Sequence, residues 1–401
     1  MFRVLGRAAL GAMLAVTATA GVAQAKKITV LHVFGASGDG GRARAQVMLD
    51  PGGNLFGTTL QGGIGSNGVV FQVAPDGTES VFHAFTGDDG VAPEGGLVTD
   101  GAGNLFGTAS EGGASGDGTV FTLASDGQIT VLHDFAGGKD GKAPRGTLVR
   151  DRKGNLYGTT ALGGAHGFGT VFEVAPSGKE KVLYAFTGGT DGSEPVSGLV
   201  MDAQGNLYGA TQSGGDAGGG VVSHNGAVFK LAHGPGKLWT ESVLYTFQGG
   251  AAGSSPESGL AIDASGNLYG TTTGGLTCFS DGNCGTVFKL APNGVETVLH
   301  AFFGIGGSDG AVPTSLTMDK KHDLYGTTAI GGGSRCDEEG CGTVFTISAS
   351  GVYRQLYAFK GGDNGDGPQA LVRDAKGNLF GATYGGGGAA DVGLIFEIKR
   401  K

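Results

Sequence analysis

Short apolar runs, separated by glycine-rich and polar segments, recur along the chain from Ile28 to Ile398. In a representative stretch they cover Gly96 to Thr99, Asn104 to Ala109, Thr119 to Ala124 and Thr130 to Phe135. None reaches the length of a helix, and all are rich in Val, Leu, Phe, Tyr and Thr, which favour strands. The pattern therefore predicts units of four short antiparallel strands, called A, B, C and D below.

The same unit occurs seven times, at intervals of about 50 to 60 residues. Its B strand carries the motif Asn-Leu-(Phe/Tyr)-Gly, in which Asp replaces Asn once, and an Asp precedes the motif by four residues. The motifs begin at Asn54, Asn104, Asn155, Asn206, Asn267, Asp323 and Asn378. Four antiparallel strands in a unit of this size are typical of one blade of a β-propeller.

The two ends of the repeat array are complementary. Ile28 to Phe34 has the pattern of a D strand without A, B and C before it, and the last unit ends with a C strand at Ile395 to Ile398. Pairing these two strands would complete a seventh blade and leave no long unpaired edge. We therefore predict an all-β fold, a single seven-bladed β-propeller domain over residues 26–401. The alternative, a parallel β-solenoid, needs capping repeats that the pattern does not contain.

The repeated cassette resembles a known family. Asp-x-x-Gly-Asn-Leu-Tyr-Gly-Thr-Thr, a Gly-Gly pair and Gly-Thr-Val-Phe together are similar to the repeat of choice-of-anchor tandem repeat GloVer-containing proteins. The resemblance covers nearly all of the chain after residue 25, and it implies a secreted bacterial repeat protein without implying an enzymatic activity. Members carry C-terminal anchoring segments, whereas Leu394 to Lys401 reads as a C strand and a basic tail. We therefore expect release into the periplasm or the medium.

The first 25 residues have the pattern of a secretory signal peptide. Arg3 and Arg7 precede an apolar run from Ala8 to Val22, and Ala23 to Ala25 forms a small-x-small cleavage signal. The alternative is a membrane anchor, but the run is shorter than the roughly 20 residues that cross a bilayer. We predict a signal peptide at residues 1–25, a secreted product and no membrane span.

Composition and charge narrow the classes of partner. The chain has 85 glycines in 401 residues, about three times average usage. Their recurrence at fixed places in the repeat favours architecture over disorder. The expected places are turns of unusual φ, and B-strand positions that a neighbouring chain segment or an aromatic ring approaches closely. The formal net charge is −9. Cleavage after Ala25 would remove the two positive charges of Arg3 and Arg7 and so make the chain more acidic. An acidic chain is a poor match for nucleic acid.

Repetition also separates scaffold from candidate function. The Asp of each A-to-B turn is expected to cap that turn rather than act as a carboxylate catalyst or calcium ligand. One D-strand position holds His32, His83, His133 or His300 in some units and Tyr in the others, which favours a packed aromatic with a polar edge over a metal ligand. The D-to-A loops carry single Asp-Gly pairs, fewer than a calcium site needs. We predict no cofactor and no metal.

The loop between strands B and C is longer in the fourth, fifth and sixth units than in the others. B-to-C and D-to-A loops emerge on the same face of a propeller, here called the long-loop face. Elaborated loops on a rigid scaffold commonly bind partners. Residues 212–225, 273–284 and 329–341 are therefore a candidate binding patch, with neutral loop variation as the alternative.

All four cysteines lie in this patch. We predict disulfides between Cys278 and Cys284 and between Cys336 and Cys341, each within one loop, with pairing between the loops left open. A zinc site is disfavoured because the usual CxxC spacing is absent.

Candidate catalytic residues are few. The positions where A strands begin, around the mouth of the channel, hold Arg44, Glu94, Arg145, Val196, Glu257, Thr314 and Gln369, a mixed set. His166 and His224 are histidines particular to single units on the long-loop face. The sequence contains no Gly-x-Ser-x-Gly elbow, no metal-spaced histidine cluster and no phosphate loop. A propeller hydrolase or lyase acting at the channel mouth is therefore the second interpretation.

The chain's one tryptophan, Trp239, falls in an extended C-to-D connection of the fourth unit. It could anchor a partner or cover a local apolar gap.

Together these patterns predict a secreted, monomeric, non-catalytic propeller that binds a protein or a polysaccharide. A structural component of the cell envelope is the third interpretation. The candidate binding residues are Glu94, Arg145, His166, His224, Trp239 and Glu257.

Overall fold

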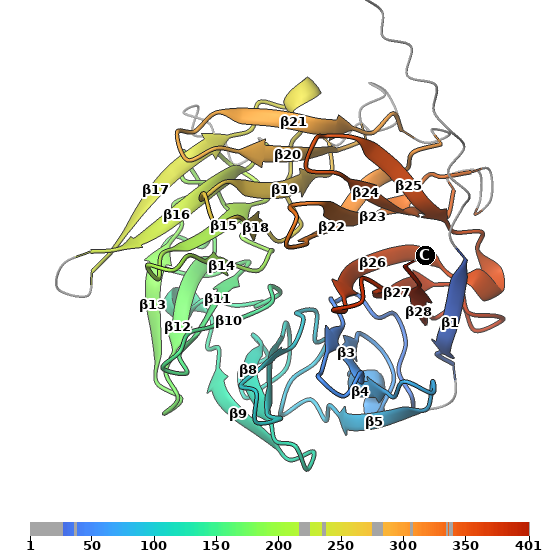
Figure 1. The fold of residues 1–401 in the computed structure, drawn as a ribbon. Helices are drawn as coiled ribbons and strands as arrows, with labels where there is room; N and C mark the ends of the chain where they lie inside the picture. Colours follow the sequence, from blue (N-terminus) through green and yellow to red (C-terminus); the bar gives the residue numbers. More distant parts are fainter. Residues whose placement is uncertain are drawn as a thin grey trace, which may run out of the picture.

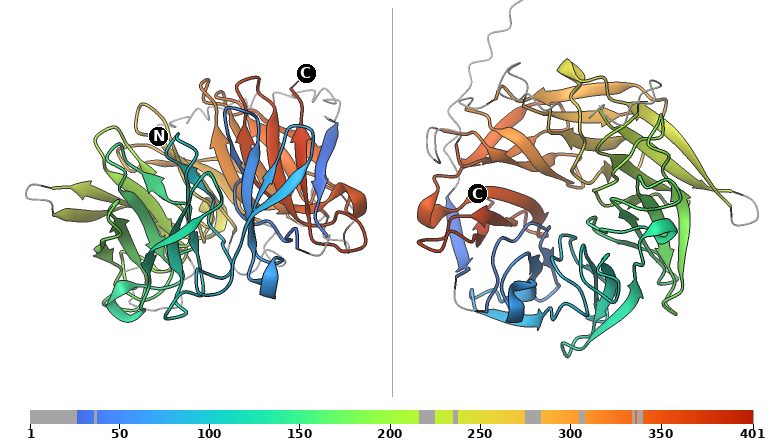
Figure 2. Two further views of the ribbon diagram at one scale, coloured as in Figure 1. Left: turned by 90° about the horizontal axis from the view of Figure 1, so that it is seen from below. Right: turned by 180° about the vertical axis from the view of Figure 1, so that it is seen from behind.

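The computed structural model describes residues 27–35, 38–215, 225–234, 238–274, 284–304, 308–333, 336 and 340–400. Its strands form seven four-stranded antiparallel sheets arranged in a ring (Figure 1). The second strand pairs with the first and third in each sheet, and the fourth lies at the periphery, as the side and rear views also show (Figure 2). The structure confirms the predicted seven-bladed propeller and excludes the solenoid.

The blades are numbered along the chain. Blade one comprises β2 (Met48–Leu49), β3 (Leu55–Thr59), β4 (Val69–Val73) and β5 (Glu79–Ala84). Blade two comprises β6 (Val98–Thr99), β7 (Leu105–Ala109), β8 (Thr119–Leu123) and β9 (Ile129–Asp134). Blade three comprises β10 (Val149–Arg150), β11 (Leu156–Thr160), β12 (Thr170–Val174) and β13 (Glu180–Ala185). Blade four comprises β14 (Val200–Met201), β15 (Leu207–Thr211), β16 (Ala227–His233) and β17 (Trp239–Thr246).

The remaining blades follow the same order until the ring closes. Blade five comprises β18 (Ala261–Ile262), β19 (Leu268–Thr272), β20 (Thr286–Leu290) and β21 (Glu296–Ala301). Blade six comprises β22 (Ala311–Met318), β23 (Leu324–Ile330), β24 (Thr343–Ile347) and β25 (Tyr353–Ala358). Blade seven comprises β26 (Asp366–Arg373), β27 (Leu379–Gly385), β28 (Leu394–Ile398) and, from the other end of the chain, β1 (Ile28–Val33). Short 3-10 turns include η1 (Ile64–Ser66), η2 (Gly138–Asp140), η4 (Gly250–Ala252) and η5 (Gly362–Asn364).

The ring closes through the first strand. β1 pairs antiparallel with β28, from Ile28 opposite Ile398 to Val33 opposite Leu394. Figure 1 shows the blue strand β1 beside the red strands of blade seven. The predicted closure is therefore confirmed, and both ends of the array are paired, as edge protection requires.

The core lies between the blades. A phenylalanine after each D strand makes an edge-to-face contact with the C-strand phenylalanine of the next blade, with ring centroids 5.1 to 5.4 Å apart. Phe85 and Phe121, for example, are fully buried at the junction of blades one and two. This geometry is favourable for aromatic pairs, so the same contact joins all seven blades, including the closure.

The A-to-B turns confirm the structural role of their aspartates. In blade three, Asp151 Oδ1 accepts hydrogen bonds from the backbone N–H groups of Lys153 (2.8 Å) and Asn155 (2.9 Å). Asp151 Oδ2 accepts a hydrogen bond from the Asn155 side chain at 2.9 Å. The bond from the backbone four residues on recurs in every blade, at Asp50, Asp100, Asp151, Asp202, Asp263, Asp319 and Asp374.

The glycine inside each B strand is required by a close approach. A Cβ added at Gly158 would lie 2.5 Å from Cζ of Phe172 and 2.8 Å from Cδ2 of Leu148. A real Cβ does not approach other carbons so closely. The ring of the C-strand phenylalanine therefore occupies the place of a B-strand side chain, as the glycine pattern predicted.

The variable His/Tyr position of the D strands also behaves as expected. His83 Nε2 lies 2.8 Å from Asp89 Oδ2, and its ring meets Phe85 edge-on at 5.2 Å. In blade three Tyr184 donates to Asp191 Oδ2 at 2.9 Å instead. Either ring thus packs on phenylalanine while its polar edge reaches an aspartate of the D-to-A loop.

One predicted disulfide is confirmed and two predictions lie outside the described residues. Cys336 and Cys341 are bonded within their loop. Cys278 is outside the described residues, so its pairing with Cys284 stays a prediction. The predicted signal peptide at residues 1–25 is likewise outside them. Within the described ranges, no helix is both long and apolar enough to span a bilayer.

Candidate functional site

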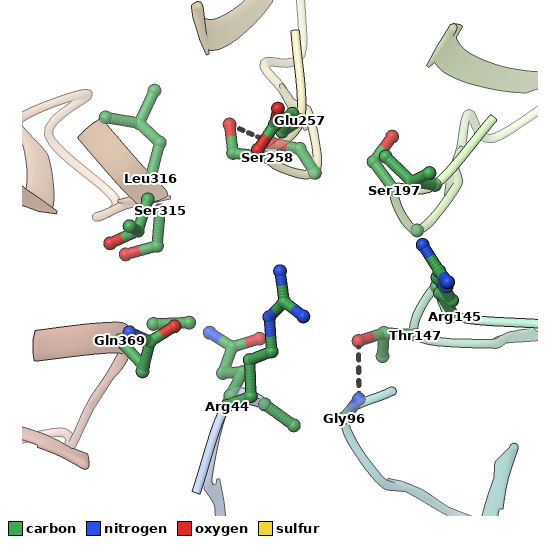
Figure 3. Close-up of a pocket in the computed structure, with 18 of the residues that line it drawn as sticks. Arg44, Gly96, Arg145, Thr147, Ser197, Glu257, Ser258, Ser315, Leu316 and Gln369 are labelled. Atoms are coloured by element: carbon green, nitrogen blue, oxygen red, sulfur yellow. Dashed lines mark hydrogen bonds between the residues drawn. The ribbon is translucent and has the colours of Figure 1, made fainter. Parts of the chain in front are cut away.

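A cavity of about 500 Å³ lies in the central channel, and every blade contributes to its wall. The residue at the start of each A strand lines it: Arg44, Glu94, Arg145, Val196, Glu257, Thr314 and Gln369. These are the channel-mouth positions that the sequence pattern singled out. Figure 3 shows Arg44, Arg145 and Glu257 reaching the same space from different sides.

A repeated backbone geometry aims these side chains at the axis. In six blades the lining residue directly follows a proline, namely Pro93, Pro144, Pro195, Pro256, Pro313 and Pro368. In all seven blades the residue two positions before the lining residue has a left-handed φ between 52° and 57°. These residues are Arg42, Ala92, Ala143, Glu194, Ser255, Val312 and Gly367. Such φ values are uncommon outside glycine. Because this backbone geometry recurs in all blades, the fold imposes it. Variation of the lining residue between blades therefore changes only the chemistry of the channel.

Glu94 is held between two arginines. Arg44 Nη1 lies 3.4 Å from Glu94 Oε2, and Arg145 Nε lies 3.6 Å from Glu94 Oε1. Ser110 also donates to Glu94 Oε1, at 3.2 Å. The Glu94 side chain is only 15% exposed, whereas those of Arg44 and Arg145 are 55% and 43% exposed. The carboxylate is therefore shielded, while both guanidinium groups present donors to the channel.

The second carboxyl group that lines the cavity, that of Glu257, is paired with the amide of Gln212. Gln212 donates from Nε2 to Glu257 Oε1 at 2.7 Å. Surrounding protein raises the pKa of Glu257 because the carboxylate loses hydration, and the Gln212 amide and Arg44 oppose that rise. The residue remains open to the lumen, so its carboxyl group is available to a bound molecule.

A buried hydroxyl completes the polar wall. Ser197 lines the cavity and is 4% exposed, and its Oγ has no hydrogen-bond partner among the described residues. Buried polar groups in proteins nearly always have a partner. Ser197 was not singled out from the sequence, and its only signal was its position beside a lining residue. Gln212 was included only as the first residue of the predicted patch 212–225.

The predicted loop patch meets this cavity at two points. Gln212 and Thr273, which begin the long loops of blades four and five, both line the cavity. Most of the remaining patch, residues 216–224, 275–283, 334–335 and 337–339, lies outside the described residues. The channel and the start of these loops thus belong to one site on the long-loop face.

Of the two histidines predicted as binding residues, the structure describes one. His166 is exposed in the B-to-C loop of blade three and does not line the cavity. His224 lies outside the described residues.

The expected loop position of Trp239 is wrong. Trp239 begins β17 and pairs with His233, because two further residue pairs extend the β16–β17 hairpin. Its ring contacts Tyr157 at 6.0 Å and His233 at 5.0 Å between centroids. It packs against the core between blades three and four, which favours the interpretation that it covers an apolar gap.

Solved structures similar to this chain share its fold. The extracellular domain of a protein assigned as a one-component system from B. thetaiotaomicron has a TM-score of 0.59 at 10% identity. It covers 94% of this chain, which spans only 40% of that domain's length. The extracellular domain of a protein assigned as a hybrid two-component system from the same organism gives a TM-score of 0.55 at 12% identity, over 94% of this chain and 41% of that one.

A third structure is of similar size to this chain. A protein assigned as a 6-phosphogluconolactonase from Bacteroides uniformis has a TM-score of 0.50 at 14% identity, over 80% of this chain and 85% of that one. No curated protein sequence matches this chain. At such identities the structural matches establish the propeller fold alone.

The repeat itself identifies the family. The model of the Gloeobacter/Verrucomicrobia repeat matches residues 11–223 and 218–401, and so covers nearly the whole chain. The chain belongs to the Gloeobacter/Verrucomicrobia repeat family.

Proposed function

We propose that this protein is an exported, monomeric, non-catalytic propeller that binds a small carbohydrate in its central channel. The observation that carries the proposal is the convergence of one side chain from every blade on a single cavity, with Arg44 and Arg145 offering exposed donors.

The size and chemistry of the cavity favour this class of ligand. A volume of about 500 Å³ is within the range of small-molecule sites. Its described lining residues include arginine, glutamate, glutamine, serine and threonine and no aromatic side chain. Carboxyl and amide groups match hydroxyls, and guanidinium groups match a carboxylate or phosphate. A sugar that carries an acidic group would use both sets.

Two observations support export and binding. The sequence predicts a signal peptide at residues 1–25. The two extracellular domains with the same fold belong to proteins assigned as a one-component and a hybrid two-component system. Both observations favour a role outside the cytoplasm.

Isothermal titration calorimetry against a panel of neutral sugars and uronic acids tests the proposal. We expect the wild type to bind at least one member, with acidic sugars preferred. The double variant Arg44→Ala/Arg145→Ala should raise the dissociation constant at least about tenfold, because each charge-assisted hydrogen bond contributes about 1.5–3 kcal/mol. Arg152→Ala is the matched control, since Arg152 is exposed in an A-to-B turn away from the cavity.

Two results would overturn this function. One is the absence of binding to every sugar in the panel. The other is equal affinity of the wild type and the double variant while the double variant keeps its melting temperature.

A hydrolase or lyase is the second candidate, and the environment of Glu257 favours it. A carboxyl group with a raised pKa beside Gln212, in the same cavity as two arginines, has the properties of a proton donor. Turnover of a glycoside or lactone that disappears in Glu257→Gln, without loss of fold, would replace the binding proposal by this one.

A further inference from the structure

Three potential metal ligands meet at the junction of blades two and three, away from the channel. They are His133 of β9, Asp140 of η2 and Glu180, the first residue of β13. One donor atom from each lies within 4.8 Å of the other two. His133 and Asp140 side chains are 18% and 20% exposed, so the cluster is partly buried but reachable from solvent.

The cluster is held in place by its surroundings. Asp140 Oδ2 accepts the backbone N–H of Ala136 at 2.8 Å and lies 3.3 Å from His133 Nε2. The ring of His133 stands edge-on to Phe135, with centroids 4.8 Å apart. The orientations of the imidazole and of one carboxylate are therefore already set, which lowers the cost of binding a ligand.

Within the described part of the chain, Glu180 contributes an unpartnered oxygen to the cluster, as the equivalent glutamates Glu79, Glu241 and Glu296 do at their own junctions. The Oε1 atom of Glu180 is buried and has no hydrogen-bond partner among the described residues. The donor atoms of Glu180, Asp140 and His133 lie within 4.8 Å of one another. Two carboxyl groups thus face each other with an imidazole beside them, an arrangement that a cation would stabilise.

We propose that His133, Asp140 and Glu180 bind a divalent transition-metal ion of the Zn²⁺ class and so link blades two and three. One imidazole nitrogen and two carboxylate oxygens form a donor set that zinc accepts, with a fourth position left for water. Calcium, which prefers six to eight oxygen ligands, is a poorer match. The site lies outside the channel, so it does not depend on the proposed function.

The other blades supply a natural comparison. His83 and Asp89 form the same pair at the junction of blades one and two, with Nε2 and Oδ2 2.8 Å apart, but Ile129 occupies the position of Glu180. His83 therefore lacks the third ligand. The same residue types, His32, Asp39 and Glu79, occur at the junction of blades seven and one, but among the described residues only the His133 set brings all three donor atoms within 4.8 Å of one another.

Zinc titration of the tag-free protein by calorimetry at fixed pH tests the proposal, after dialysis against chelator. Bound Co²⁺, detected by its visible absorption, gives an independent readout. We expect His133→Gln and Glu180→Gln each to lose one bound equivalent, or to bind it at least about tenfold more weakly. His83→Gln should keep the wild-type number. The melting temperature in chelator shows whether each variant is folded, and Glu180→Gln, which keeps the shape of the side chain, is the variant expected to stay folded.

Loss in the first two variants with retention in His83→Gln would support the site. Absence of zinc binding by the wild type would overturn it. Full binding by folded Glu180→Gln would also overturn it, because it would show that Glu180 is not a ligand of the ion.

Discussion

The packing of a phenylalanine ring over each B-strand glycine leads to a quantitative prediction for Gly158→Ala. The backbone φ at Gly158 is not left-handed, so alanine fits the local conformation. The added Cβ, however, would lie 2.5 Å from Phe172 and 2.8 Å from Leu148, both of which are at most 2% exposed. An ordinary contact between carbon atoms is about 3.5–4.0 Å, so the ring has to move by about 1 Å in a core without free space.

Overpacking of this kind costs about 1–3 kcal/mol. A part of it is offset because alanine loses less conformational entropy than glycine in a strand, by about 0.5–1 kcal/mol. We therefore expect a net loss of about 1–2 kcal/mol. For a chain of this length the loss corresponds to a fall of roughly 1–3 °C in melting temperature.

Differential scanning calorimetry and urea titration measure the change. Gly259→Ala is the control, because Gly259 also has no left-handed φ and a Cβ there would meet nothing within 4 Å. Phe172→Leu supplies a double-mutant cycle, in which a smaller side chain should accommodate the alanine and reduce its cost. Equal stability of Gly158→Ala and Gly259→Ala, or strict additivity in the cycle, would refute the packing explanation.

Three further predictions concern other parts of the ring. Burial, and then the nearby Asp191 carboxylate, raise the pKa of Glu241 from 4.5 to about 7. The folded protein therefore holds the proton of the Glu241 carboxyl group more tightly than the unfolded chain does, and it loses stability as the pH rises from 4.5 to 7. Glu241→Gln should remove that loss of stability and should leave the stability at pH 4 unchanged. Parallel pH profiles of the urea midpoint in the wild type and the variant would contradict this prediction. Replacing Cys336 and Cys341 by serine opens a loop of sequence separation 5 and should cost about 2 kcal/mol, which an unchanged urea midpoint would disprove. Trp239→Ala should cost about 1–2 kcal/mol, less than a fully buried tryptophan, and should leave sugar affinity unchanged, whereas lost affinity in calorimetry would restore Trp239 as a ligand anchor.

Much of the fold could be predicted because its determinants are local and occur seven times. The Asp151 turn depends on residues within four positions of each other. The disulfide between Cys336 and Cys341 closes a short loop. Closure of the ring followed from the D-strand pattern at one end and its absence at the other. Trp239 was misplaced because the extension of a hairpin depends on how the flanking residues pair, which the repeat pattern does not specify.

The candidate sites could be predicted only in part. Repeat alignment identified Arg44, Glu94 and Arg145 as channel positions, but not that Glu94 would be held between the two arginines. That arrangement depends on how neighbouring blades are rotated about the axis, since each residue comes from a different blade.

By itself, the sequence determined the strand order, the number of blades, the turns and the place of the glycines, because each rests on a pattern that spans only a few residues and is repeated. Only the tertiary structure decided which side chains from different blades face one another. Glu180 is 40 residues from Asp140 along the chain, yet their carboxyl groups meet at a blade junction. Packing of the phenylalanine pairs sets the distance between blades, and contacts across that distance have no local signature in the sequence.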